Sequence, residues 1–215
     1  MTSFNWDNAP KSLHTVNLKY NQLTSFNWDN APSSLHYVSL WFNQLTSFNW
    51  DNTPKSLHSV DLENNQLTSF NWKNAPSTLD LVDLGGNRLT SFNWENSPPS
   101  LDHVNMGGNR LTSFNWDNAP SSLHSVTLYD NQLTSFNWQN TPKSLYAVYG
   151  FNNELRSYKS ACKIQRFYIR RHTRRRVAAN KITNGCHNWV WNPKCKDGTM
   201  GIRPRLDTHF LFSST

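Results

Sequence analysis

Histidines recur at one position of the sequence and have the chemistry of a metal site. His14, His36 and His58 are each 22 residues apart, and His124 falls on the same period. Imidazole nitrogens are common zinc ligands, so such a row could form a metal array. Imidazoles repeated this regularly do not converge on one tetrahedral centre, however, and Asp80, Asp102 and Tyr146 interrupt the row. We therefore predict a solvated polar row and no bound metal.

The cysteines are the next candidates for chemistry. Cys162, Cys186 and Cys195 all lie in the last quarter of the chain, near His187 and His209. No CxxC spacing occurs, so structural cysteines are favoured over a zinc site. An odd, low count also indicates a reducing compartment instead of a disulfide framework.

Motifs of enzymatic catalysis are absent from the sequence. It has no nucleophile elbow, phosphate-binding loop, zinc-protease helix or paired catalytic carboxylates. We therefore expect no enzyme and no cofactor. No apolar run approaches the roughly 20 residues of a membrane-spanning helix, and the first residues lack the pattern of a secretory signal. These features predict an intracellular protein without a membrane partner.

A 22-residue repeat organises most of the chain. Tryptophans mark it at positions 6, 28, 50, 72, 94, 116 and 138. One unit, which runs from Leu13 to Phe26, reads L-x-x-V-x-L-x-x-N-x-L-x-x-F. Seven units account for residues 1–154, and residues 155–183 and 184–215 form two further segments.

The unit resembles the leucine-rich repeat, and its PSSL and NNQLTSF stretches look most like the short repeats of bacterial leucine-rich proteins. Two departures are an Asn-Trp pair on the returning arm and Gly150 in place of a leucine. The resemblance implies a mainly β repeat solenoid, with a concave parallel sheet and an extended or 3-10 convex arm.

The chemistry of one unit leads to the same architecture. Val16 and Leu18 alternate with polar residues, which is the period of a strand, and Asn21 can satisfy backbone groups in the turn that follows. Pro10 opposes a helix on the returning arm. A single unit cannot bury its apolar face, so units must stack, and seven strands would span roughly 29 Å. The repeated Phe and Trp residues should form internal ladders.

Sequence variation concentrates at the outward strand positions, while the exposed return-arm positions of Thr24, Ser25, Asn27 and Asn30 hardly change between units. Outward positions of such a solenoid face its concave side, the usual binding surface. Two interpretations remain open, a surface diversified for a partner and neutral drift. The first predicts a binding face made of Tyr37, Trp41, Phe42, Asp61, Glu63, Asp83, Gly85, Gly107, Tyr129, Tyr149 and Phe151.

The composition of this face predicts the chemistry of its guest. Aromatic side chains stand at both ends, with the acidic residues Asp61, Glu63 and Asp83 between them. We therefore expect a protein or peptide that is basic and has apolar anchors. The glycine pairs at 85–86 and 107–108 leave room across the face. Alternatively, they only relax a tight turn.

The first unit leaves an apolar edge. Met1 occupies its leucine position, and Phe4, Trp6, Leu13, Val16 and Leu18 would face water or a partner. Unpaired strand edges promote association, so we expect edge-to-edge self-association through this unit, or a short cap formed by the first residues.

The segment after the repeats is strongly basic. Residues 156–215 contain 14 Lys or Arg against two acids, whereas residues 1–155 contain seven against twelve. Residues 155–183 are predicted to form a basic helix, which is similar to an IQ motif, the helix that binds calmodulin-like light chains. The residues predicted to bind a partner there are Ile164, Gln165, Arg170, Arg171, Arg174, Arg175 and Arg176.

Three interpretations of this basic helix remain open: a calmodulin-like partner, nucleic-acid phosphates, and a solvated cap on the solenoid. Residues 184–215 are predicted to form a small hairpin. The repeats, basic helix and Trp-rich ending together look like repeat proteins of giant DNA viruses of amoebae, which implies host cytoplasm or a virion. The leading hypothesis is a non-catalytic interaction scaffold, and the alternative is a nucleic-acid-associated or virion structural protein.

Overall fold

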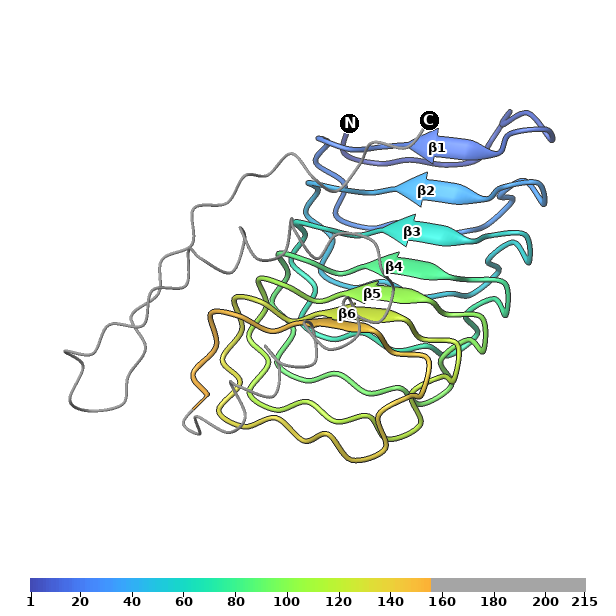
Figure 1. The fold of residues 1–215 in the computed structure, drawn as a ribbon. Coiled ribbons are helices and arrows are strands. Elements are labelled where there is room, and N and C mark those ends of the chain that lie inside the picture. The colour runs from blue at the N-terminus through green and yellow to red at the C-terminus, as the bar shows by residue number, and fades with distance from the viewer. Residues whose placement is uncertain (156–215) are drawn as a thin grey trace, which may run out of the picture. The chain divides into compact units, whose positions relative to one another are not determined.

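The computed structural model describes residues 1–155, which form a stack of similar turns with one short strand each (Figure 1). Each strand has three residues. The strands are β1 (Thr15–Asn17), β2 (Tyr37–Ser39), β3 (Ser59–Asp61), β4 (Leu81–Asp83), β5 (His103–Asn105), β6 (Ser125–Thr127) and β7 (Ala147–Tyr149). Within this part of the chain, no helix could cross a membrane.

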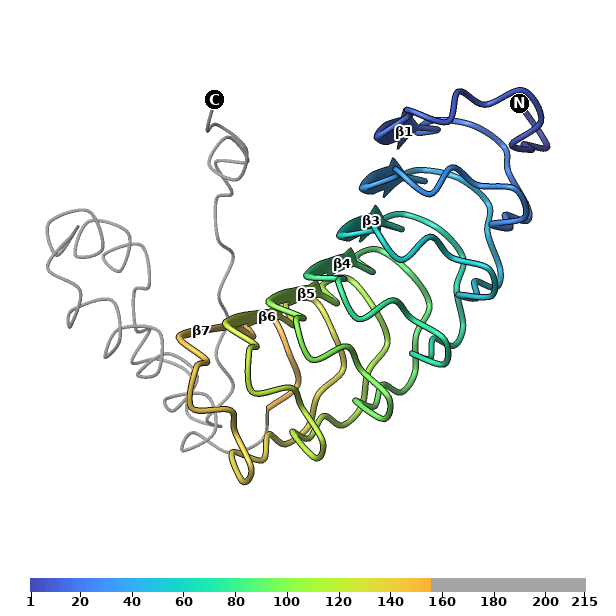
Figure 2. The ribbon, with the colours of Figure 1, turned by 90° about the vertical axis from the view of Figure 1, so that its right-hand side faces the viewer.

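The strands form one parallel sheet in sequence order, from β1 to β7. The register places each residue beside its equivalent in the next repeat, so that Val16 pairs with Val38 and Val60 with Val82. The 22-residue period of the sequence is therefore also the period of the backbone. Figure 2 shows the strands on the inner side of the arc made by these repeats, and the returning arms on the outer side.

The core lies between the sheet and the returning arms and consists of aligned apolar columns. Leu35, Val38 and Leu40 are fully buried, and so are their equivalents in the next repeats. Each of these side chains packs on copies of itself in the repeats before and after. Burial of this kind contributes about 25 cal/mol per Å² of apolar surface, which no single repeat could obtain alone.

An asparagine ladder ties consecutive repeats together where the chain leaves the sheet. The Oδ1 atom of Asn43 accepts a hydrogen bond from the backbone N–H of Leu23 at 3.0 Å. Its Nδ2 atom donates to the backbone oxygens of Leu18 at 3.0 Å and Leu40 at 2.9 Å. Asn65, Asn87, Asn109 and Asn131 repeat the arrangement. The predicted turn role of these asparagines is confirmed, and each one also bridges two repeats.

The Phe and Trp residues form the predicted internal ladders. Neighbouring tryptophans such as Trp50 and Trp72 stack with ring centroids 6.4 Å apart. Phe70 meets Trp72 edge to face at 4.8 Å. The indole Nε1 of Trp50 donates to the backbone oxygen of Asn71 in the next repeat at 2.9 Å. The tryptophans of the first five repeats therefore combine apolar burial with a satisfied indole N–H, whereas Nε1 of Trp116 has no partner among the described residues.

The convex arm was predicted to be extended or 3-10 helical. It is extended with tight turns, and residues 1–155 contain no 3-10 helix. One turn closes with the Ala31 N–H donating to the oxygen of Trp28 at 2.9 Å. Asn30, inside this turn, has φ of 65°, a left-handed conformation that asparagine tolerates well. The arm thus reverses direction at tight turns of a few residues each.

The first repeat is partly covered. The Met1 oxygen accepts a hydrogen bond from the Gln22 N–H at 2.9 Å, just as the oxygen of Leu23 accepts from Gln44. Met1 therefore does occupy the leucine position. The predicted exposed edge is smaller than expected, because the second repeat buries Trp6 and Leu18. The remaining edge residues, Phe4, Leu13 and Val16, are half-buried.

The predicted basic helix and hairpin lie in residues 156–215, outside the described residues. The same holds for Ile164, Gln165, Arg170, Arg171, Arg174, Arg175 and Arg176.

Candidate functional site

Three outward columns of side chains line the inner side of the arc, and we call them, together with Tyr20 and Phe42 beside Trp41, the concave face. The middle residue of each strand points into the core, as the buried Val60 and Val82 show, so the strand residues on either side of it point outward. These two columns are residues 15, 37, 59, 81, 103, 125 and 147, and residues 17, 39, 61, 83, 105, 127 and 149. The third column, two residues after each strand, is 19, 41, 63, 85, 107, 129 and 151.

An aromatic group forms at the first two repeats. Tyr20 lies 4.8 Å from Trp41 and 5.3 Å from Phe42, measured between ring centroids. The Nζ atom of Lys19 lies 6.0 Å from the centroid of the Trp41 ring. Tyr20 and Phe42 are 59% and 55% exposed, which is high for residues of this size. Trp41 and Phe42 were predicted, whereas Lys19 and Tyr20 were not included, although both belong to the positions that vary between repeats.

A second aromatic group lies at the other end of the face. Tyr129 and Phe151 stack with ring centroids 5.1 Å apart and planes 9° from parallel. Tyr149 ends β7 in the neighbouring column and is half-buried. The two ends of the predicted face are therefore separate, and no aromatic contact joins them within the described residues.

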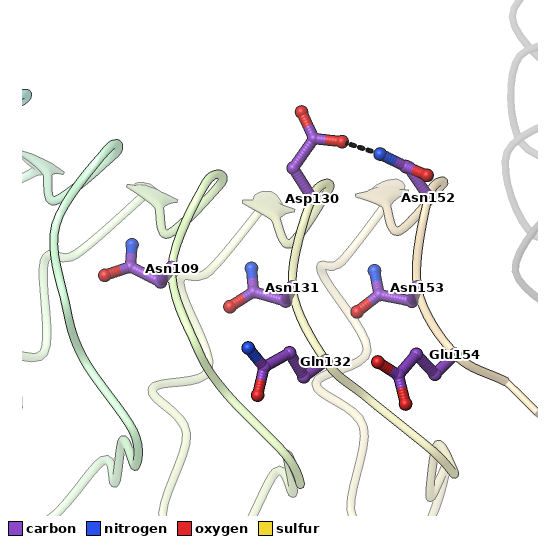
Figure 3. Close-up of a pocket in the computed structure, with 7 residues that line it drawn as sticks. All are labelled: Asn109, Asp130, Asn131, Gln132, Asn152, Asn153 and Glu154. Atoms are coloured by element: carbon purple, nitrogen blue, oxygen red, sulfur yellow. Dashed lines mark hydrogen bonds between the residues drawn. The ribbon is translucent and has the colours of Figure 1, made fainter. Parts of the chain in front are cut away.

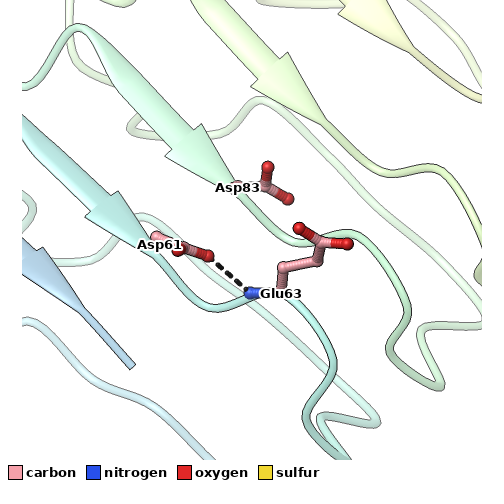
Figure 4. A group of neighbouring side chains, drawn as sticks. All are labelled: Asp61, Glu63 and Asp83. Carbon is pink, nitrogen blue, oxygen red and sulfur yellow. Dashed lines mark hydrogen bonds between the residues drawn. The ribbon is translucent and has the colours of Figure 1, made fainter. Parts of the chain in front are cut away.

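Between these ends, the structure brings together three carboxylates, which we call the acidic group (Figure 4). One oxygen from each of Asp61, Glu63 and Asp83 lies within 4.8 Å of the others. Asp61 and Asp83 are paired residues of β3 and β4, so their side chains stand side by side. The predicted acidic floor of the face is thus a compact cluster instead of a dispersed charge.

Neutral donors hold the acidic group in place. The Ser39 hydroxyl donates to Asp61 Oδ2 at 2.9 Å, and the Asn105 amide donates to Asp83 Oδ1 at 2.9 Å. Backbone N–H groups of Glu63 and Gly85 donate to Asp61 and Asp83. Within residues 1–155, no Lys or Arg forms a salt bridge with these three carboxylates. Their negative charges are therefore hydrogen-bonded but not neutralised.

Burial and mutual repulsion disfavour the ionised forms of these acids. Burial raises the pKa of Glu63 to about 7, and the charges of Asp83 and Asp61 add to the effect. Burial also raises the pKa of Asp83 to about 6, against the opposing hydrogen bonds from Gly85 and Asn105. The pKa of Asp61 is raised for the same main reason. Glu63 and Asp83 therefore exchange protons close to neutral pH.

The four glycines divide between the two roles that the sequence left open. Gly86 and Gly108 have φ of 61° and 67°, and the residues at the same position of every other repeat are also left-handed. They serve the turn. Gly85 and Gly107 instead make room. A Cβ atom on Gly107 would lie 2.6 Å from the Tyr129 ring, and one on Gly85 would lie 3.2 Å from Glu63 Cγ.

The space left by the missing side chains of Gly85 and Gly107 is therefore already occupied by side chains of the neighbouring repeats. Tyr129 leans over Gly107, and Glu63 leans over Gly85. The Glu63 charge is one cause of a raised pKa of the Tyr129 hydroxyl, after burial. Tyr37 has a raised pKa as well, caused first by burial and then in part by Asp61 and Asp83. Two phenols thus flank the acidic group, as the order of the repeats predicted.

The recurring histidines form an exposed stack beside this face. His14, His36 and His58 have ring centroids 5.2 Å apart, and Nδ1 of His58 lies 2.7 Å from the oxygen of Ser56. Farther along the row, Asp102 contacts both His103 and His124. Within residues 1–155, the acidic group places three ligand atoms close enough together to hold a metal ion, and no set of histidines does so.

A separate hollow of about 410 Å³ opens beside the last three repeats (Figure 3). It is lined by Asn109, Asp130, Asn131, Gln132, Asn152, Asn153 and Glu154. Three of its asparagines, Asn109, Asn131 and Asn153, already use both ends of their amides in the ladder. The hollow contains none of the residues predicted to bind a partner.

Solved structures with a similar architecture include three leucine-rich-repeat proteins of bacteria. The functional domain of InlJ from Listeria monocytogenes, which includes a cysteine ladder, aligns with a TM-score of 0.54, 17% identity and 67% of this chain. YopM from Yersinia enterocolitica aligns with a TM-score of 0.55 and 23% identity over 68% of this chain. The internalin InlF from L. monocytogenes aligns with a TM-score of 0.56 and 23% identity over 71% of this chain.

The alignments cover 31%, 30% and 45% of those three proteins, so this chain spans less than half the length of each. No protein-family model matches the sequence. No curated protein matches it either. The likeness in structure shows that the repeats of this chain adopt the leucine-rich-repeat fold.

Proposed function

We propose that this protein is a non-catalytic interaction scaffold that binds a protein partner on its concave face. The main support for the proposal is that the repeats differ from one another mostly at the outward positions of the concave face. Their core columns and return arms are near copies, whereas the outward columns change from Lys19 to Trp41 to Glu63 along a single row. A surface that only had to be soluble would not need such different side chains at equivalent sites.

The exposed aromatic side chains support the same proposal. Tyr20 and Phe42 remain more than half exposed, although the fold has ample apolar core elsewhere. Aromatic residues are enriched where proteins bind proteins, because a rigid ring contributes a large contact area. The leucine-rich-repeat fold supports the proposal more generally, since such solenoids present extended concave binding surfaces.

The test uses the full chain as bait, with paired variants. Phe42→Ser and Glu63→Lys alter the concave face, whereas Lys55→Ser and Glu95→Lys make matched changes at exposed positions of the return arm. We expect proteins that bind the parent and the return-arm variants to be lost from both concave-face variants. Equal binding by all four folded variants would refute the proposal.

A second function is proposed for residues 156–215, on the basis of their charge. With 14 Lys or Arg against two acids, this segment would bind nucleic-acid phosphates, and such binding weakens steeply as salt rises. Co-purified nucleic acid that is released by salt, and a partner lost after nuclease treatment, would support this function. A calmodulin-like light chain is the other candidate for Ile164, Gln165 and Arg174, and its binding should resist nuclease.

A further inference from the structure

We propose that the guest of the concave face is an extended protein segment in which an arginine or lysine stands two residues after a large apolar residue. The apolar side chain lies on the aromatic group of Tyr20, Trp41 and Phe42, and the cation lies against Asp61, Glu63 and Asp83. This inference rests on the proposed function and states which partner chemistry the face selects.

The aromatic group shows a local conflict that folding does not explain. Tyr20 and Phe42 both have φ of 56°, in the left-handed region. The equivalent positions in five other repeats hold Asn64, Gly86, Gly108, Asp130 and Asn152, which are the residue types that adopt this conformation readily. Bulky aromatic residues pay a conformational cost there, and these two remain exposed. Residues that violate a local preference without gaining burial are expected at functional sites.

Trp41 adds a second unexplained feature to the same group. Its Nε1 atom is buried and has no hydrogen-bond partner among the described residues. Buried indole N–H groups normally find an acceptor, as those of Trp28 and Trp50 do in the core ladder, although Nε1 of Trp116 in that ladder also lacks one among the described residues. Together with the conformational cost at Tyr20 and Phe42, the Trp41 indole indicates that the aromatic group is not arranged for stability alone.

The acidic group adjoins the aromatic group directly. Trp41 and Glu63 occupy the same column in consecutive repeats, and the backbone N–H of Phe42 donates to the oxygen of Glu63 at 3.0 Å. Neighbouring strands are ~4.8 Å apart, and every second side chain of an extended segment points to the same side, ~6.6 Å from the last. One extended segment therefore reaches both groups with side chains two residues apart, and this is why the inferred guest has its apolar and cationic residues at that spacing.

Charge selects a cation for the second position. Asp61 and Asp83 stand directly opposite each other on paired strands, an arrangement that like charges disfavour. Their partners are neutral donors, so the repulsion is not relieved within the described residues. A guanidinium can donate two parallel hydrogen bonds to such carboxylates and can also stack on an aromatic ring.

Lys19 already interacts with both the aromatic group and the acidic group, as the guest cation is proposed to do. Its ammonium lies over the Trp41 ring, and its charge opposes the rise in the pKa of Asp61. A guest cation would take the same place between ring and carboxylate. Lys19 then competes with the guest, so removing its charge should strengthen binding, whereas the loss of a merely structural contact would not.

Binding should be coupled to protons. Besides one another, the three carboxylates of the acidic group face the phenols of Tyr37 and Tyr129 and the ammonium of Lys19, which acts on Asp61. A bound cation stabilises the ionised carboxylates, so it expels the protons that they hold near neutrality. Because the pKa of Glu63 is about 7 and that of Asp83 about 6, affinity should rise with pH through this range and level off above it.

The experiment measures binding of a fluorescent peptide, Gly-Ser-Phe-Ser-Arg-Ser-Arg-Gly, to the full chain by anisotropy. A matched peptide carries citrulline, the neutral isostere, in place of both arginines. The protein variants are Phe42→Ser, the pair Glu63→Gln with Asp83→Asn, and Lys19→Met, with Glu95→Gln on the return arm as control. Circular dichroism verifies that each variant is folded.

We expect about tenfold weaker binding for the citrulline peptide, for Phe42→Ser and for the paired amide variant, and no change for Glu95→Gln. Lys19→Met should bind about threefold more tightly. The amide pair should also lose the rise in affinity between pH 6 and 8. Failure of the parent chain to bind the arginine peptide would overturn the inference.

Two further outcomes would overturn the inference in distinguishable ways. If Phe42→Ser weakens binding but both peptides and the amide pair behave like the parent, the concave face binds its guest without a cation, and the proposed function stands. If calcium chloride alone gives calorimetric binding that Asp83→Asn abolishes, and calcium displaces the peptide, the carboxylates form a metal site instead.

Discussion

At the residue scale, some side chains stabilise the repeat and others destabilise it. Asn43 belongs to the first class, because its amide satisfies three backbone groups in two repeats. Glu63 belongs to the second, because burial and two neighbouring carboxylates oppose its charge. The two classes occupy equally regular positions in the sequence, so position alone does not distinguish them.

Replacing Asn43 with alanine should cost about 3 kcal/mol of unfolding free energy, because buried N–H and C=O groups lose their partners. Chemical denaturation measures the change. Asn52→Gly is the control, since its φ of 61° suits glycine and its amide bonds only the exposed Asp29. A loss below 1 kcal/mol for Asn43→Ala would mean that water replaces the ladder.

The stability of the protein should depend on pH through Glu63. Its pKa is raised from 4.5 to about 7, so the folded state binds more protons than the unfolded state between these values. Stability therefore falls as pH rises through this window, and the cost is complete above about pH 7. Glu63→Gln should stabilise the protein at pH 8 by about 1 kcal/mol, after allowance for solvent screening, and have little effect at pH 4.5. Equal melting shifts at both pH values would contradict this.

At the scale of the strand and its turn, glycine pairs show how one element depends on its neighbour. Gly86 and Gly108 serve the left-handed turn of their own repeat. Gly107 serves the next repeat, since its missing side chain is the space that the Tyr129 ring occupies. A turn in this solenoid is thus adapted to its own backbone and also to the side chain stacked on it.

A double-mutant cycle tests this dependence. Gly107→Ala should cost about 2 kcal/mol, because the new Cβ would overlap the Tyr129 ring. In a Tyr129→Ala background the same change should be nearly neutral, since the overlapping ring is gone. Gly108→Ala is the contrasting case, because a backbone cost of about 1 kcal/mol should persist in both backgrounds. Additive costs for the Gly107 and Tyr129 changes would exclude the proposed contact.

At the scale of the whole array, every repeat is stabilised by the next, so its first edge is exceptional. Phe4, Leu13 and Val16 are half-buried, whereas equivalents such as Leu35 and Val38 are fully buried. The sheet also ends at β1, whose outer edge has no neighbouring strand among the described residues. The stacking that stabilises the array therefore also leaves a surface that another strand could cover.

Self-association through β1 should consequently be measurable. Sedimentation of the full chain over a range of concentrations should show reversible association, and Val16→Lys should weaken it by placing a charge on the edge. Val16 is suited to this test because it is half-buried, unlike the core residue Val60. A chain that stays monomeric at high concentration, or a Val16→Lys variant that associates like the parent, would refute the prediction.

Much of the fold could be predicted from the sequence, because its apolar columns leave few alternatives. A 22-residue period with Val and Leu in alternation specifies one strand per unit, and identical neighbours specify an in-register parallel sheet. The Asn, Phe and Trp ladders follow for the same reason. A residue that recurs in every unit must pack on copies of itself, whatever the exact path of the chain.

The tertiary structure alone decided which outward residues meet. The repeat places Trp41, Glu63 and Tyr129 in one column, but their side chains lean in different directions, toward Tyr20, Gly85 and Gly107. Tyr20 therefore joined the aromatic group without having been predicted. Asp61, Glu63 and Asp83 likewise became one cluster. Burial dictates the inward side chains, whereas the conformation of an outward side chain depends on the size of its neighbour in the adjacent repeat, and that contact exists only once the repeats are stacked.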